Sequence, residues 1–334
     1  MKHWFLWVFV SVVFHSCSQP TPVNQNLNIT ADNLVEEIAK QVKNYPSERI
    51  YGLGYSNDNC YFDMFVDGIR AYRYPGRGVV GSTAIEINEL LFHSGKHTIS
   101  YKMYPLYTLE EEGVTTTQNT LLDSSYVALD VYSYNLKDKN EGDIFYAKYG
   151  TPNIAIKNAQ GDTIYKFAGS GKTYYEGSFE VEVDLPYQLQ PPFATAQDLR
   201  KMDQKQLMTK LLAKYKEVWQ IYKNRELDNI ARLEFDMLKY YAVSHYATKE
   251  VIKKNWDFLY DNYKNTSFEM QPLANYKLEF FADGKLVALM LDTKDNKIRG
   301  NTALWIKLKD EENTPVFFNR YFYIPQGETE FKVY

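Results

Sequence analysis

The hydrophobic period of this chain changes twice, and that change limits the possible folds more than any other feature of the sequence. Up to about residue 187, apolar residues alternate with polar ones, most clearly over residues 179–185. A period of two is typical of strands that bury one face. Between residues 207 and 263 the apolar residues recur every three or four positions, as in amphipathic helices, and after Pro272 the alternation returns. The sequence therefore predicts an α+β protein.

Prolines and a polar stretch divide the chain into segments. Pro186, Pro191 and Pro192 stand where the period changes from strand to helix. Three apolar stripes at helical spacing then predict a helical segment of two or three helices. The expected organisation is a signal peptide over residues 1–16, a lipidated tether over 17–32, an antiparallel β-sandwich-like domain over 33–190, the helical segment over 191–266 and a C-terminal β region over 267–334.

One stretch of the expected sandwich is similar to known modules. Residues 85–91 alternate, a Ser94-Gly95-Lys96 turn follows, and a second alternating run ends at Pro105. This pattern resembles a recurring piece of jelly-roll and immunoglobulin-like domains attached to bacterial surface enzymes. The resemblance covers about twenty residues and implies a β-sandwich architecture, but it carries no functional residue.

The first seventeen residues indicate export. Lys2 precedes an almost unbroken apolar run from Trp4 to Phe14, and Ser16-Cys17 ends it. The run is shorter than the roughly 20 residues that span a bilayer, and its flanks are those of a secretory signal peptide. Its end resembles the lipobox of bacterial lipoproteins, which implies that Cys17 is lipidated and becomes the first mature residue. We therefore expect a protein anchored by lipid to the bacterial cell envelope, facing the periplasm or displayed on the cell surface.

Charge and cysteine content narrow the partners. The formal net charge is −4. Nucleic-acid binders need clustered Lys and Arg to displace counterions, so we expect no nucleic-acid partner. With Cys17 modified, only Cys60 remains, so no internal disulfide is possible in the mature chain. We expect Cys60 to be a buried, inert thiol, because no neighbouring pattern would lower its pKa.

Three motifs that could bind a cofactor or a metal each lack an essential part. Residues 169–173 read Gly-Ser-Gly-Lys-Thr, but Lys166 stands where a phosphate-binding loop needs glycine. Residues 76–81 have dinucleotide-binding glycine spacing without the acidic residue that should follow. His93 and His97 flank a turn instead of sharing a helix. We therefore predict no cofactor, no nucleotide and no metal.

One segment stands out as a candidate binding surface. Residues 70–77 place Tyr72, Arg73, Tyr74 and Arg77 in an expected loop beside a strand. Tyr and Arg are frequent anchors of protein interfaces. The alternative interpretation is that the Tyr rings cover a sheet edge while the Arg side chains keep it solvated.

No catalytic motif was found, so we predict no catalytic residue and favour binding over catalysis. The leading hypothesis is a lipid-anchored envelope protein that binds a protein partner, one version being an immunity protein against an antibacterial toxin. A glycan-binding surface lipoprotein is an alternative, because exposed aromatic residues can form sugar platforms. The third hypothesis is an envelope-polymer hydrolase that uses a Glu/Asp pair across a cleft.

Overall fold

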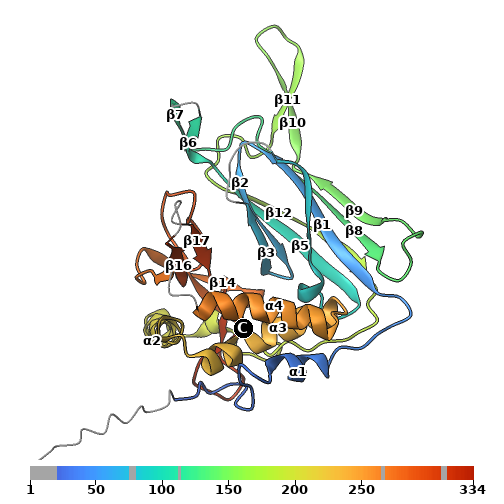
Figure 1. Cartoon of the computed structure of the whole chain (residues 1–334). Coiled ribbons are helices and arrows are strands. Elements are labelled where there is room, and N and C mark those ends of the chain that lie inside the picture. Colours follow the sequence, from blue (N-terminus) through green and yellow to red (C-terminus); the bar gives the residue numbers. More distant parts are fainter. Residues whose placement is uncertain (1–20, 75–79, 112–113, 265–267, 310–313) are drawn as a thin grey trace, which may run out of the picture.

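The computed structural model describes residues 21–74, 80–111, 114–264, 268–309 and 314–334. Antiparallel sheets dominate the N-terminal part, helices follow, and short strands end the chain (Figure 1). The predicted α+β class and the predicted order of strands, helices and strands are confirmed.

Two four-stranded antiparallel sheets form the upper part of the molecule in Figure 1. The first sheet has the order β4 (Val80–Glu86), β1 (Arg49–Asp58), β8 (Tyr126–Asn135) and β9 (Ile144–Gly150). The second sheet has the order β12 (Tyr175–Val183), β5 (Gly95–Tyr104), β2 (Tyr61–Val66) and β3 (Ile69–Tyr74).

The two sheets share one core. Every second residue of β8 is buried, as the alternating sequence predicts. Aromatic contacts join the sheets, with Tyr55 and Phe62 at 5.5 Å between ring centroids and the hydroxyls of Tyr101 and Tyr149 3.2 Å apart. The N-terminal part is therefore sandwich-like in its packing.

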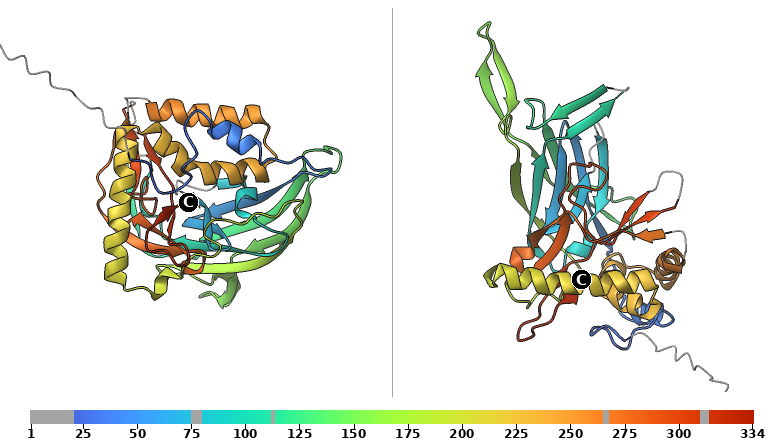
Figure 2. Two further views of the ribbon diagram at one scale, coloured as in Figure 1. Left: turned by 90° about the horizontal axis from the view of Figure 1, so that it is seen from below. Right: turned by 90° about the vertical axis from the view of Figure 1, so that its left-hand side faces the viewer.

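The helical segment contains three long helices, α2 (Gln204–Asn224), α3 (Leu227–Ser244) and α4 (Lys249–Lys264). The Asp203 carboxylate caps α2 by accepting from the Gln206 amide at 2.8 Å, and α2 ends at Arg225 in the left-handed conformation. The predicted apolar stripes face a second core shared with the C-terminal strands. Figure 2 shows the helices gathered at the end of the molecule opposite the two projecting hairpins.

The N-terminal segment departs from the expected tether. Val23 and Ile29 are buried against the helices, and helix α1 (Leu34–Ala39) contacts α3 and α4 instead of the sandwich. The Gln25 side chain exchanges hydrogen bonds of 3.2 and 2.9 Å with the backbone of Val333. The tether expected over 17–32 is thus packed on the body from Val23 onward. Its few apolar residues show no period, which is why the sequence pattern missed this packing.

The C-terminal region has two small sheets, which agrees with the β structure expected there. One sheet has β14 (Tyr276–Phe281), β15 (Leu286–Leu291), β18 (Phe322–Tyr323) and β19 (Lys332–Val333), and the other has β13 (Phe268–Met270), β16 (Trp305–Leu308) and β17 (Pro315–Phe317). Phe65 stacks on Phe281, so this region covers the outer face of the second sheet.

Two hairpins project from the sandwich at the end opposite the helices (Figures 1 and 2). One consists of β6 (Tyr107–Glu111) and β7 (Val114–Gln118), and the other of β10 (Asn153–Lys157) and β11 (Thr163–Phe167). In the described part of the chain, every helix is too short or too polar to cross a bilayer.

Candidate functional site

The predicted binding residues lie on a strand and not in a loop. Tyr72, Arg73 and Tyr74 belong to β3, the edge strand of the second sheet, and Arg77 lies outside the described residues. Tyr74 is buried and stacks on Phe62, and Tyr72 packs against the sandwich core. Both tyrosine rings therefore pack against the sandwich core beside the sheet edge.

Arg73 does not solvate that edge. Its side chain is 11% exposed, and its Nη1 donates to both carboxylate oxygens of Asp63 at 2.9 Å. The same nitrogen also donates to the Gly300 carbonyl at 3.2 Å. The C-terminal region covers this face of the sheet, which turns an expected surface arginine into a buried ion pair.

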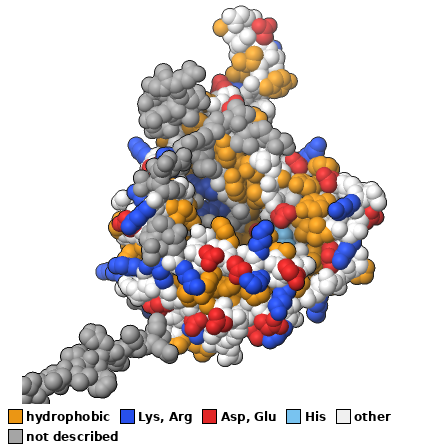
Figure 3. All heavy atoms as spheres, in the orientation of Figure 1, with side chains coloured by type: hydrophobic (Ala, Val, Ile, Leu, Met, Phe, Trp, Pro, Cys, Tyr) orange, Lys and Arg blue, Asp and Glu red, His pale blue; other side chains and the backbone are white. Residues whose placement is uncertain are grey.

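Large apolar side chains are exposed on the β10–β11 hairpin. Tyr165 is 72% exposed, and Ile154 and Ile164 are each more than 40% exposed. Ile156 pairs with Ile164 across the ribbon, so Ile154, Ile156 and Ile164 share one face, while Tyr165 lies on the other beside Ala155. We call Ile154, Ile164 and Tyr165 the hairpin surface. Figure 3 shows hydrophobic side chains on this projection.

The hairpin surface is held in place only at its base. The Phe167 amide donates to the Asp123 carbonyl at 2.9 Å, and Ala168 donates to Pro152 at 2.9 Å. An isolated two-stranded ribbon is marginally stable in water and leaves both edges open for pairing. Apolar side chains on both of its faces therefore form a surface that a second molecule could cover.

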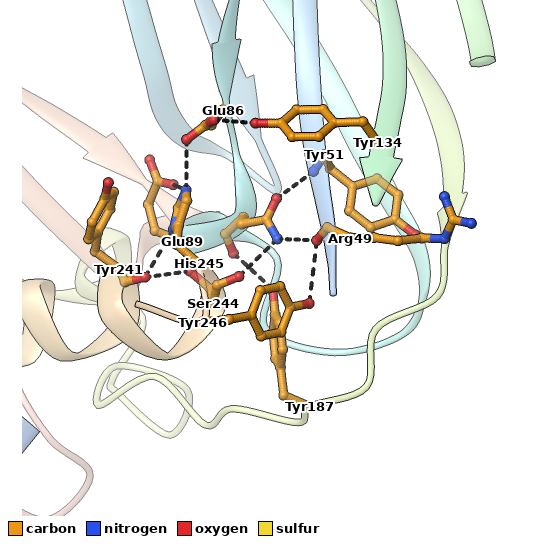
Figure 4. A network of polar contacts seen from close by, with 11 residues as sticks. Arg49, Tyr51, Glu86, Glu89, Tyr134, Tyr187, Tyr241, Ser244, His245 and Tyr246 are labelled. Carbon is orange, nitrogen blue, oxygen red and sulfur yellow. Dashed lines mark hydrogen bonds and ion pairs between the residues drawn. The ribbon is translucent and has the colours of Figure 1, made fainter. Parts of the chain in front are cut away.

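A buried polar network joins the sandwich to helix α3 (Figure 4). Asn88 is at its centre. This residue lies in the short helix η1 (Asn88–Leu90), and its side chain is fully buried. Its Oδ1 accepts from the Tyr51 amide at 2.6 Å, and its Nδ2 donates to the carbonyls of Arg49 and Ser244 at 2.9 and 3.0 Å. One side chain thus joins strand β1 to the end of helix α3.

Two carboxylates meet one imidazole beside this network. His245 Nε2 lies 3.3 Å from Glu86 Oε2 and 3.7 Å from Glu89 Oε2. His245 Nδ1 lies 2.9 Å from the Tyr241 carbonyl, so this nitrogen carries a proton. The Nε2 of a neutral ring would then point its lone pair at two carboxylates, and a proton shared among the three groups relieves that repulsion. Tyr134 donates to Glu86 at 2.7 Å from the solvent side.

The environment places that proton on Glu89 near neutral pH. The Glu89 side chain is about one-third exposed as a whole, but its Oε2 is shielded from solvent. Burial raises the pKa of the Glu89 carboxyl to about 7, and the neighbouring Glu86 charge adds to this shift. Burial lowers the pKa of His245, although the Tyr241 carbonyl and Glu86 oppose that shift. The arrangement can therefore hold and exchange one proton at the seam between sheet and helix.

We expect Glu89→Gln to remove a pH-dependent loss of stability. The folded state keeps the Glu89 proton up to about pH 7, whereas an unfolded Glu releases it near its ordinary pKa of 4.5. The stability that the protonated Glu89 contributes to the wild-type fold is thus fully present below pH 4.5 and is lost as pH rises through 7. The shift corresponds to about 3 kcal/mol, which partial exposure reduces to about 1–2 kcal/mol.

Urea unfolding of both proteins at several pH values between 4 and 8 measures this effect. The variant should gain stability relative to the wild type as pH rises through that window. His245 acts in the opposite direction, since protonation of the unfolded ring below about pH 6.5 costs stability in both proteins. A difference between variant and wild type that does not change with pH would contradict the assignment.

The two neighbouring histidines have different environments. His97 is buried, whereas His93 is exposed, and their rings stack at 4.7 Å. His97 donates to Asp67 at 2.6 Å and to the His93 carbonyl at 2.8 Å, so both of its nitrogens are engaged. Burial opposes a charge on His97, but Asp67 and the carbonyl raise its pKa. Within the residues that the structure describes, no group of three potential ligands could hold a metal ion.

Cys60 is fully buried, and burial raises the pKa of its thiol. This agrees with the expected inert thiol, because a reactive cysteine needs a lowered pKa and access to solvent. Cys17 lies outside the described residues. No known family, curated protein or solved structure matches this chain.

Proposed function

We propose that this protein is a lipid-anchored component of the bacterial cell envelope that binds a protein partner through the hairpin surface. The observation that carries the proposal is the exposure of Ile154, Ile164 and Tyr165 on a ribbon that projects from the body. Two of these three side chains are aliphatic and match an apolar protein groove, whereas a sugar site needs aromatic faces together with polar groups. Complete burial would gain about 1.5–3 kcal/mol for each large side chain.

The positions of the N-terminal segment and of the hairpin surface support the same proposal. The described chain begins beside the helices, and the hairpin surface lies at the opposite end of the molecule. An anchor at Cys17 would thus hold the helical end near the lipid leaflet and direct the hairpin surface away from it. A partner in the periplasm or outside the cell could then reach the hairpin without approaching the membrane.

Site-specific photo-crosslinking tests the partner surface. A photoreactive residue in place of Tyr165 should give one stoichiometric protein adduct in envelope extracts, and Ile164→Asp should reduce its yield about tenfold. Phe258 on α4 is the matched control, because it is 69% exposed but lies in the helical segment. Adducts of equal yield at both positions, or no adduct at Tyr165, would contradict the proposal.

The immunity-protein version makes a further demand. If the adduct contains an antibacterial toxin, co-expression of this chain should protect cells, and Ile164→Asp should abolish protection. If the captured partner is not toxic, the immunity-protein version is wrong, but the proposal of a partner-binding hairpin surface still holds.

The anchor has its own test. Cys17→Ala should abolish incorporation of labelled fatty acid and leave the precursor unprocessed, because Cys17 is the residue that the lipid would modify. Labelling followed by separation of membrane and soluble fractions measures both effects, and Cys60→Ala serves as the cysteine control. Unchanged labelling in Cys17→Ala would show that the anchor assignment is wrong.

A further inference from the structure

Three arginines surround one carboxylate where the C-terminal region covers the second sheet. Arg70 and Arg73 come from β3, and Arg299 comes from the turn after β15. Arg70 and Arg73 both donate to the Gly300 carbonyl, at 2.7 and 3.2 Å. Asp63 is the carboxylate that Arg73 binds, and it is 4% exposed. Arg73 thus binds the buried carboxylate directly, and Arg70 and Arg299 lie close enough to feel its charge.

The chain brings these groups together through Gly300. A Cβ at this position would lie 2.2 Å from the Arg73 guanidinium carbon, so the arginine lies directly on the glycine backbone. Gly300 also has a φ of +66°, which a side chain would disfavour. A glycine at position 300 therefore allows the Arg73 side chain to pack directly against the backbone.

Arg299 is the most deeply buried of these cations and lacks a carboxylate partner among the described residues. It is 7% exposed, and its guanidinium lies between two rings, 3.8 Å from the Tyr61 centroid and 4.4 Å from that of Tyr107. Its Nη2 donates to the Pro105 carbonyl at 3.2 Å, and its Nε makes no hydrogen bond. Burial lowers the pKa of Arg299, and the nearby Arg73 charge adds to this effect.

Arg73 and Arg299 line a common cavity of about 580 Å³. The Nε of Arg73 is likewise buried without a hydrogen-bond partner. Lys277 and Lys294 add positive charge to the lining, against Glu279 and Asp292. Tyr104, Tyr107 and Tyr174 also line the cavity. Figure 3 shows basic side chains on the floor of a hollow between the sandwich and the C-terminal region.

The burial of the Arg299 charge destabilises the folded protein unless an anion binds beside it. A buried cation without a counter-charge loses several kcal/mol of hydration energy, which nearby dipoles and rings recover only in part. Tyr107, which stacks on Arg299, also has a φ of +59°, a strained conformation for a bulky residue. Strain of this kind is common where side chains are fixed in place for a ligand.

We propose that this cavity binds the oxyanion group, carboxylate or phosphate, of a small molecule whose remaining part lies against the tyrosines. The guanidinium groups of Arg73 and Arg299 that line the cavity donate to the oxyanion, and the lysines attract it from solvent. A volume of about 580 Å³ is in the range of small-ligand sites. This site is distinct from the hairpin surface and does not depend on a protein partner.

Isothermal titration of the purified full-length chain tests the site. The probes are sodium phosphate, acetate and glucuronate, each measured against sodium chloride at equal ionic strength. We expect saturable one-to-one binding of phosphate, glucuronate or both, with a matching rise in melting temperature. Phosphate without glucuronate would indicate a phosphate-bearing ligand, and glucuronate above acetate would indicate a carboxylate on a sugar-sized body.

Charge variants then locate the binding. Arg299→Gln should weaken affinity at least tenfold through the loss of a charge-assisted donor. Lys294→Glu reverses an exposed charge on the cavity lining that folding does not require, and it should weaken affinity about threefold to tenfold. Arg200→Gln, at an exposed site outside this cavity, should leave affinity unchanged.

Two outcomes would overturn the proposal. One is the absence of binding to every probe at concentrations up to about 10 mM. The other is binding that Lys294→Glu leaves unchanged, which would apply even if Arg299→Gln failed to fold.

Discussion

Glu234→Leu is expected to destabilise the folded state by about 3–5 kcal/mol, enough to unfold a marginal protein. Glu234 is fully buried in α3 and forms an ion pair with Arg320, which is 4% exposed. The hydroxyls of Tyr222 and Tyr263 both donate to the same carboxylate oxygen at 2.8 Å. Loss of the carboxylate would leave the Arg320 charge and two hydroxyls buried without their acceptor.

Urea unfolding measures this effect, and a second substitution identifies its cause. Arg320→Met in the Glu234→Leu background should restore most of the lost stability, because removal of both charges also removes the desolvation penalty. Lys253→Ala is the control, since its pair with Asp257 on α4 is exposed and contributes little. A double variant no more stable than the single one would show that lost packing, and not an unpaired charge, causes the defect.

Asn88→Ala is expected to destabilise the protein by about 2–4 kcal/mol. The substitution would leave the Tyr51 amide and the carbonyls of Arg49 and Ser244 buried without partners, and each such loss costs about 1–3 kcal/mol before the structure relaxes. Asn88→Asp should be at least as damaging, because its carboxylate would face two carbonyl oxygens.

The midpoint of urea unfolding and amide hydrogen exchange together test this prediction. Exchange should accelerate first at the C-terminal turn of α3, where Asn88 binds Ser244. Asn140→Ala provides a control at an exposed asparagine. A loss of stability with unchanged exchange at this turn would show that Asn88 does not hold the helix to the sheet.

The sequence predicts those parts of the fold that depend on local periodicity. Helices α2, α3 and α4 follow the stripes expected from Leu207, Ile230 and Ile252, and the alternating strands of the sandwich appear as expected. In α2, α4 and β8 one face is buried and the other is more exposed, so the spacing of apolar residues is enough to predict the element. Helix α3 is buried on all sides over residues 229–236, and only its apolar stripe was predicted.

Features that depend on contacts between distant segments could not be predicted in this way. Arg73 lies on a strand whose outer face is also covered, so its contact with Gly300 cannot be inferred from the sequence near Arg73. Glu234 and Arg320 likewise come from different elements and are paired only by packing. One signal was available for β3, because Ile69, Tyr72 and Tyr74 favour strands and make up half of its six residues.

The reciprocal hydrogen bonds between Gln25 and Val333 have a consequence for biogenesis. The amino-terminal segment packs on α3, but its hydrogen bonds to Val333 can form only after the C-terminal strands have been synthesised. Contacts so remote in sequence form late and slow the acquisition of native structure. Removal of β19 would therefore take away the Val333 partner of Gln25, while the contacts of Val23 and Ile29 with the helices would remain.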